Sequence, residues 1–258
     1  MHSLSIYVAR ESGLHSLNPL TKLVLTLCIM ICGVTLPGTW DSYWVLALVI
    51  VPLSLWGTVT KLMLRLVMKI SWPLVLSVFI IQTVFWGNGT ALFEIGPISP
   101  KIEGVLFAVR SSGRIILIMS DFILFSLTTR PDTLMISIKQ AGVPSSLAYI
   151  VVTTLQLVPQ LVAKANTILD AQRSRGMETQ GNLFTRARAL LPLVLPLVVG
   201  SLLEVEERAI AIEARGFNSK RVETSLLEIP DTQNQQHARI GFVGITIILI
   251  AARYLWLL

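Results

Sequence analysis

The side chains that most often carry out chemistry in proteins are few and scattered in this sequence. The histidines His2, His15 and His237 have no carboxylate or cysteine at ligand spacing, so we expect no metal site. Cys28 and Cys32 are four residues apart in an apolar run, which is typical of packing residues and not of a disulfide or metal pair. The sequence predicts neither a bound cofactor nor a metal.

Nucleophilic and nucleotide chemistry are also poorly represented. Ser111, Ser112 and Ser201 have no partnered His or Lys pattern that would mark a nucleophile. The phosphate-loop motif G-x-x-x-x-G-K-[ST] is absent, so the chain should not bind ATP by that means. We therefore expect a transducer and not an enzyme.

Three ionisable residues lie inside one long apolar stretch. Arg110, Arg114 and Asp121 fall within residues 105–129, and the last two are seven positions apart, on one helix face. Ionisable residues at membrane depth usually face protein or water and have partners. One interpretation is a proton or ion relay. We favour a structural role, because a relay usually shows several deep carboxylates and here there is one.

A short phrase that ends in arginine and glycine occurs twice, forty positions apart. Residues 171–177 read AQRSRGM and residues 211–217 read AIEARGF, with Arg175 and Arg215 in register. Each phrase closes a long helix-like segment. Arginine followed by glycine is an ordinary way for a helix to stop, because the cation favours the negative helix end. A matched pair, however, is an internal repeat and indicates two equivalent docking tips.

Composition indicates an integral membrane protein. The 258 residues are 53% hydrophobic and 14% charged, and the mean hydropathy is +0.70. Those values fit a chain whose main surroundings are a lipid bilayer. The net charge of +6 then reflects cytoplasmic anchoring and not nucleic-acid binding. The opening residues lack the pattern of a cleavable signal peptide.

The elements that must hold these residues are helices. We expect an all-α fold with about five transmembrane helices and long amphipathic cytoplasmic helices. Lys22 lies in the first turn of the first span, where it should snorkel to the interface. Lys61, Arg65 and Lys69 form a basic loop that should be cytoplasmic, which puts the N-terminus inside and the C-terminus outside. The predicted spans are 20–36, 42–60, 70–93, 105–129 and 240–258.

Residues 130–223 combine high charge with two apolar runs, 145–163 and 189–203. Hydropathy alone would make both runs spans, for a total of seven. That topology would place Lys164, Arg173 and Arg175 outside together, against the positive-inside bias. We instead expect long helices at the inner membrane boundary. The predicted organisation is a membrane domain over 1–129, a cytoplasmic domain with two arginine-glycine tips over 130–223, a linker over 224–239 and a last span over 240–258.

Three stretches carry a resemblance to a known family. They are the opening SGLHSLNPLTKL, the segment SLTTRPDTLMISIKQAGVPSSLAYI at 126–150 and the two arginine-glycine phrases. In this order, and over nearly the whole chain, the sequence resembles the transmembrane T component of energy-coupling factor (ECF) transporters, which include the cobalt-type permeases. T components end two coupling helices in Ala-Arg-Gly triplets that dock on two ABC-type ATPases.

The resemblance implies a site and partners. The docking residues would be Ser174, Arg175 and Gly176 at one tip, and Ala214, Arg215 and Gly216 at the other. The first tip departs from the family's triplet by having serine, a similarly small residue, in place of alanine. The apolar flanks would carry a membrane-embedded substrate-binding subunit, with contacts at Leu155, Val158, Val162, Leu193 and Leu197. Arginine suits a docking tip because its planar fork makes bidentate contacts.

The function implied is coupling of ATP hydrolysis in partner subunits to uptake across the plasma membrane. The substrate would be a vitamin or a transition-metal ion such as cobalt or nickel, recognised by another subunit. Two other classes stay open at this point. A self-contained permease with its own substrate site would need polar residues at the membrane midplane, for which Arg114 and Asp121 are the only hint. A membrane-embedded enzyme would need paired catalytic groups at one depth, and none is visible in the sequence.

Overall fold

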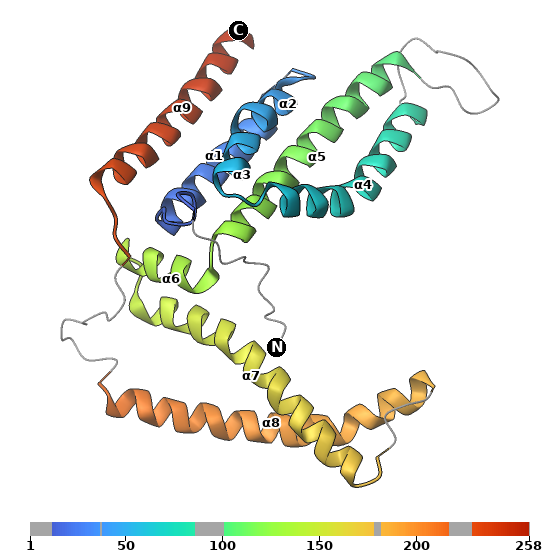
Figure 1. Cartoon of the computed structure of the whole chain (residues 1–258), viewed down its shortest axis with the longest axis vertical. Helices are drawn as coiled ribbons and strands as arrows, with labels where there is room; N and C mark the ends of the chain where they lie inside the picture. The colour runs from blue at the N-terminus through green and yellow to red at the C-terminus, as the bar shows by residue number, and fades with distance from the viewer. Residues whose placement is uncertain (1–11, 37, 86–100, 178–181, 217–228, 258) are drawn as a thin grey trace. The chain divides into compact units, whose positions relative to one another are not determined.

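The computed structural model describes residues 12–36, 38–85, 101–177, 182–216 and 229–257. These parts of the chain are helical and contain no strand, which confirms the expected all-α class. In chain order the elements are α1 (Pro19–Thr35), α2 (Asp41–Val45), the π-helix η1 (Leu46–Ile50), α3 (Val51–Trp56), α4 (Thr60–Val84), α5 (Ile102–Thr128), α6 (Pro131–Gln140), α7 (Ser145–Ser174), α8 (Leu183–Ala214) and α9 (Gln233–Leu257) (Figure 1).

The chain folds as two compact units. The larger unit contains α1 to α6 and α9, and the two-helix unit contains α7 and α8. In the larger unit α5 packs along α4 and α1, and α1 also packs along α9. Its core is made of apolar side chains from α1 to α5 and from the turns beside them, with Ile50, Leu117 and Leu127 fully buried.

The start of α1 is fixed by the Asn-Pro pair. The side chain of Asn18 accepts a hydrogen bond from the Leu20 N–H at 2.9 Å, and Pro19 occupies the first helical turn, where its missing N–H costs nothing. Asn18 is also buried, and its backbone N–H donates to Gln235 Oε1 at the start of α9 at 3.0 Å. One residue therefore both begins the first helix and ties it to the last.

Lys22 does not snorkel, in contrast to the sequence-based expectation. The residue is only 6% exposed. Its Nζ donates to the backbone carbonyl of His15 at 3.1 Å and to that of Thr128, the last residue of α5, at 3.0 Å. A cation is favourable at a helix C-terminus, where backbone carbonyls lack helical partners. The neighbouring chain ends provide acceptors within reach, so the ammonium group is held inside the protein.

The helix that follows Asp41 is broken twice. Pro52 cannot donate a backbone hydrogen bond, and just before it the chain changes to π geometry over Leu46–Ile50, with the Val51 N–H bonded to the Leu46 carbonyl. The helix then ends at Trp56, and Thr58 adopts a positive φ of 55°. The helix thus ends before the predicted span 42–60 does, because the turn at Gly57 follows Trp56.

Close packing around α5 depends on a glycine. A Cβ atom at Gly113 would lie 2.6 Å from the ring of Tyr43, closer than real Cβ contacts. The missing side chain lets the Tyr43 hydroxyl reach the Val109 carbonyl and donate to it at 3.0 Å.

Helix α4 bends partway along its length (Figure 1), and Pro73 inside it removes a helical hydrogen bond.

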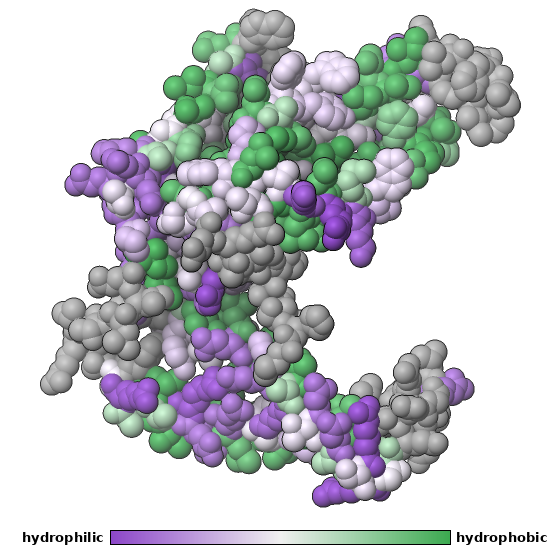
Figure 2. Space-filling view, viewed as in Figure 1, coloured by the Kyte–Doolittle hydropathy of each residue, from purple (hydrophilic) through white to green (hydrophobic). Residues whose placement is uncertain are grey.

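Three described helices are long and apolar enough to cross a membrane: Thr60–Val84, Ser146–Ser174 and Gln233–Arg253. In the apolar stretches of the first and third, only 11% and 6% of the residues are buried inside the protein. Figure 2 shows the resulting hydrophobic surface over α4 and α9. Such exposure is what a lipid-facing surface requires, and it supports the membrane class.

The helix bounds differ from the predicted spans at several ends. Helix α4 begins ten residues before the predicted start at residue 70, and residues 86–93 of that span lie outside the described residues. Helix α9 begins at Gln233, inside the predicted linker 224–239. Helix α7 qualifies as a span by length and composition, so the choice between five, six and seven spans stays open to experiment.

We expect Lys22→Met to destabilise the larger unit by about 1.5–3 kcal/mol, the usual contribution of a hydrogen bond to a charged group. Methionine keeps most of the stem but leaves the carbonyls of His15 and Thr128 without their donor. Thermal unfolding of the detergent-solubilised protein measures the change. The exposed Lys69, replaced by methionine, is the matched control, and equal stability of the two variants would contradict the role of Lys22.

The five-span prediction can be checked by cysteine labelling in a background without Cys28 and Cys32. A cysteine at position 88 should react with an impermeant external thiol reagent, because the predicted loop there is external. Position 88 lies outside the described residues. A cysteine in place of Asn182, just before α8, should stay unlabelled in intact cells. Labelling at 182 would favour the seven-span topology.

Candidate functional site

The first arginine-glycine tip closes α7 with a complete glycine stop. Arg175 is the C-cap residue and Gly176 follows it with a φ of +85°. The Gly176 N–H donates to the Arg173 carbonyl at 2.9 Å, and the Met177 N–H donates to the Gln172 carbonyl at 3.1 Å. These two bonds define the Schellman motif, which needs a left-handed residue that glycine supplies without steric cost.

The second tip closes α8 in the same way. Gly216 has a φ of +68°, and its N–H donates to the Glu213 carbonyl at 2.9 Å. Ser174 and Ala214 are the last helical residues of the two helices. Both arginines and both glycines are exposed to solvent. The repeat in the sequence therefore corresponds to two helix ends with the same local geometry and an exposed guanidinium group.

Helix α6 offers an internal comparison. It also ends in a left-handed glycine, Gly142 with a φ of +105°, whose N–H donates to the Lys139 carbonyl at 3.0 Å. The residue in the arginine's place is Ala141. Arginine is thus not required for a glycine stop in this chain. That observation favours a further role for Arg175 and Arg215, although each also complements the helix dipole.

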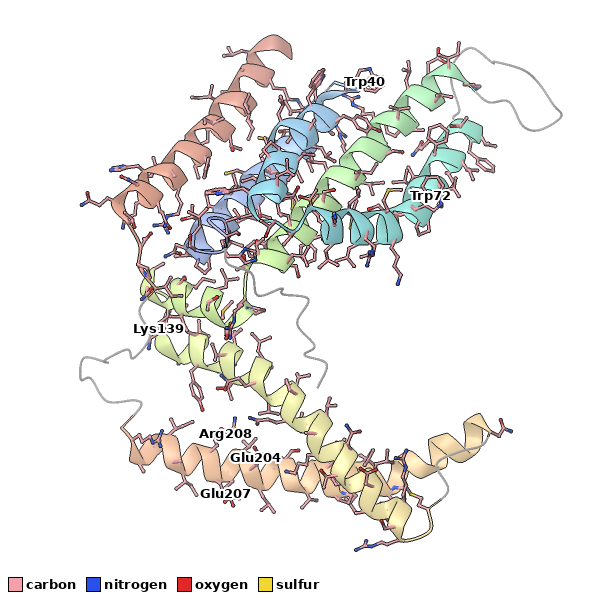
Figure 3. The ribbon with its side chains drawn as sticks, viewed as in Figure 1. Trp40, Trp72, Lys139, Glu204, Glu207 and Arg208 are labelled. Atoms are coloured by element: carbon pink, nitrogen blue, oxygen red, sulfur yellow. The ribbon has the colours of Figure 1, made fainter. Side chains whose placement is uncertain are left out.

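The two tips belong to helices that cross. Helices α7 and α8 pack against each other and their C-terminal ends point away from one another (Figure 1). Charged and polar side chains meet at the crossing. The Lys164 Nζ lies 3.4 Å from Glu204 Oε2, and Arg208 donates to Glu204 Oε1 at 3.1 Å and to Gln160 Oε1 at 3.4 Å. Figure 3 shows Glu204 and Arg208 beside the crossing.

The apolar flanks of both helices are largely unpartnered within the two-helix unit. On α7, Leu155, Val158 and Val162 are 42–50% exposed. On α8, Leu193 and Leu197 are half-buried, whereas their neighbours Val194 and Leu195 are more exposed. Val194 and Leu195 point to other sides of the helix than Leu193 and Leu197, and they offer a partner more surface than the two leucines chosen from the sequence.

Two of the three intramembrane polar residues, Asp121 and Arg114, have partners on α1 or at its end. Asp121 is 3% exposed, and its carboxyl group is hydrogen bonded to the side chain of Thr26. Arg114 donates to the Leu36 carbonyl at the end of α1 at 2.9 Å. Arg110, one turn before Arg114, is half-buried. Both contacts join α5 to α1, as expected of structural partners, and a relay stays untested.

Sequence reasoning missed the polar contact between the two helices. A signal was present: Lys164 and Glu204 are forty positions apart, like Arg175 and Arg215, and they carry opposite charges. Among the described residues, no three His, Cys, Asp or Glu side chains gather where they could hold a metal ion. What the geometry offers is a crossed pair of helices with two exposed cationic ends, in a chain of the integral-membrane class.

Comparison with known proteins defines the family. The sequence profile of the CbiQ family, described as a cobalt transport protein, matches residues 10–226. The energy-coupling factor transporter transmembrane protein EcfT of Leuconostoc gelidum subsp. gasicomitatum is 30% identical over 257 residues, covering 96% of this chain and 95% of that protein. The EcfT proteins of Thermosediminibacter oceani and Bacillus subtilis are 28% and 27% identical, covering 97% and 96% of this chain and 97% and 96% of their own lengths.

The chain therefore belongs to the CbiQ family, and the resemblance to ECF transporter T components is confirmed. It is a transmembrane component of such a transporter. Its relatives are named as transmembrane proteins of the transporter, which fits a non-catalytic subunit.

We expect Asp121→Asn to lower stability, because the amide replaces a carboxyl group that is buried against Thr26. Transport should be largely retained in the protein that still folds, since the asparagine side chain keeps an acceptor for the same partner. Substrate uptake per assembled complex measures this. Complete loss of uptake with normal assembly would instead support a proton or ion relay.

Proposed function

We propose that this chain is the coupling subunit of an ECF importer, and that it docks on two cytoplasmic ABC-type ATPases through Arg175 and Arg215. The observation that carries the proposal is the pair of matched, exposed arginine-glycine ends on two crossing helices. Each end presents a planar guanidinium group beyond the last turn of a helix. Such a group can form bidentate contacts with carboxylates and carbonyls in a groove of a partner.

Transmission of motion follows from the helix pair. ATPases change their separation as they bind and hydrolyse ATP, so tips seated on them would be drawn together or apart. Helices α7 and α8 have 30 and 32 residues, and their internal prolines all lie before the crossing, so the segments that lead to the tips are stiff. Displacement of the ends therefore becomes a change in the crossing angle of the two helices.

The apolar flanks supply the other half of the mechanism. Their exposed aliphatic side chains, among them Leu155, Val158 and Val162, suit a membrane-embedded substrate-binding subunit as the partner. A change in crossing angle would tilt that subunit and release its substrate inside. The substrate is a vitamin or a transition-metal ion such as cobalt or nickel, and the complex acts in the plasma membrane with the N-terminus of this chain in the cytoplasm.

Substitution of the tips tests the proposal. If the arginines only complement helix dipoles, Arg175→Ala and Arg215→Ala cost about 0.3–1 kcal/mol each and lysine substitutes well. If they dock on ATPases, each loss costs about 1.5–3 kcal/mol of binding, or roughly ten- to hundredfold in affinity, and lysine rescues only in part. Because two tips on one body bind with avidity, single variants should keep the ATPases but lose coupled transport.

The double variant Arg175→Ala, Arg215→Ala should lose the ATPases as well. Co-purification from cells that express the whole transporter measures retention, and ATP hydrolysis with substrate uptake measures coupling. Arg173→Ala is the matched control, because Arg173 lies in the same helix turn and pairs with Asp170 on its own helix at 3.1 Å. Normal assembly and coupled transport in the double variant would show that the arginines are only helix stops.

A further inference from the structure

The link between α7 and α8 is centred on one carboxylate. Glu204 binds Lys164 of α7 through one oxygen at 3.4 Å and Arg208 of its own helix through the other at 3.1 Å. Arg208 in turn reaches back to Gln160 of α7 at 3.4 Å. Gln160 and Lys164 are one turn apart on α7, as Glu204 and Arg208 are on α8. These four side chains, the crossing cluster, join the two helices by two separate polar contacts.

The close approach at this point depends on Gly200, one turn before Glu204. A Cβ atom at Gly200 would lie 3.0 Å from the Lys164 Nζ and 3.1 Å from its Cε. The lysine side chain thus passes over the glycine to reach the carboxylate. A larger side chain at position 200 would compete for that path.

The crossing cluster lies at equal distances from the two tips. Lys164 precedes Arg175 by eleven residues, and Glu204 precedes Arg215 by eleven residues. At about 1.5 Å per residue each arm is roughly 16 Å long. The two residues that meet at the crossing, Lys164 and Glu204, are therefore equivalent positions of the forty-residue repeat. The same is true of Arg175 and Arg215 at the two ends.

We propose that the crossing cluster is a polar hinge, in which Glu204 fixes the point about which α7 and α8 rotate. The mechanical consequence rests on the proposed coupling function, whereas the existence of the hinge does not. Apolar contact is non-directional and permits one helix to slide along another. Hydrogen bonds and ion pairs are directional and tie particular residues together. With the contact fixed at equal distances from the two tips, displacement of the tips becomes rotation, and both arms move by the same amount.

The partial exposure of the cluster suits a joint that moves. The Lys164, Glu204 and Arg208 side chains are 30–42% exposed, and pairs of this kind are individually weak. The flexible lysine and arginine side chains can follow a change of angle without breaking their contacts. Only translation along the helix axis would carry them out of reach.

Distances between the arms test the hinge in the full-length chain in lipid nanodiscs. Cys28 and Cys32 are replaced by alanine, and spin labels are placed at Ala171→Cys and Ala211→Cys, seven residues beyond Lys164 and Glu204. Pulsed electron paramagnetic resonance should give one narrow distance distribution. We expect a wider or shifted distribution for Glu204→Gln and for Lys164→Met, the second of which removes the contact between Lys164 and Glu204 but keeps Glu204 paired with Arg208.

Glu206→Gln is the matched control, because it removes the same charge from an exposed position of the same helix. Its distribution should equal that of the parent. If Glu204→Gln and Lys164→Met also leave the distribution unchanged, apolar packing alone holds the crossing and the hinge is refuted. If Glu204→Gln fails to fold, Lys164→Met decides the question by itself.

Transport assays separate this proposal from the docking proposal. The hinge variants should keep both ATPases and their hydrolysis but lose transport per ATP by about two- to thirtyfold, the range for residues that couple distant sites. A tip variant should lose coupling with unchanged distances between the arms in the isolated chain. If the docking proposal fails, the distance measurement still tests the hinge. If a hinge variant broadens the distance distribution but leaves transport unchanged, rotation of the two helices is not the motion that drives transport.

Discussion

In the larger unit, the ammonium group of Lys22 binds carbonyls from two segments that are more than one hundred residues apart. A buried cation without such acceptors would be costly, so α1 and the end of α5 are constrained to meet at this point. Asn18, one turn earlier, adds the start of α9 to the same junction. These polar contacts help to set the positions of the helices that pack along α1. Apolar surfaces that face lipid favour no particular arrangement of neighbouring helices.

The two-helix unit follows a different principle. Its helices have one another as neighbours, and most of their large apolar side chains stay exposed. Figure 2 shows hydrophilic residues over α8 in the same unit, so the pair is amphipathic and not uniformly apolar. Such a pair cannot bury its apolar area by itself. The structure accordingly requires contacts from outside this unit, and a subunit of a transporter has such contacts available.

Local features could be predicted from the sequence. The apolar runs predicted the long helices, because a run of about twenty uncharged residues in a bilayer must satisfy its backbone hydrogen bonds within itself, which a helix does. The repeated Arg-Gly phrases marked two helix ends, since glycine adopts the left-handed geometry that such an end needs. The ends of elements were predicted less well. The second helical stretch ended at Trp56, before the Gly57 turn, and α9 began within the polar linker because polar residues such as Gln233 and Gln235 also form helix.

The sequence by itself determined the membrane class, the family resemblance and the position of both tips, because each depends on residues that lie within a few turns of one another. Tertiary structure alone decided that Lys22 is buried, that Asp121 and Arg114 have partners on α1 or at its end, and that Glu204 meets Lys164 at equal distances from the two tips. The partners of Asp121, Arg114 and Glu204 are forty residues or more away in the chain, as is Thr128 from Lys22. Which of many possible polar partners comes within hydrogen-bonding distance is set by the packing of whole helices, and no local pattern in the chain specifies that packing.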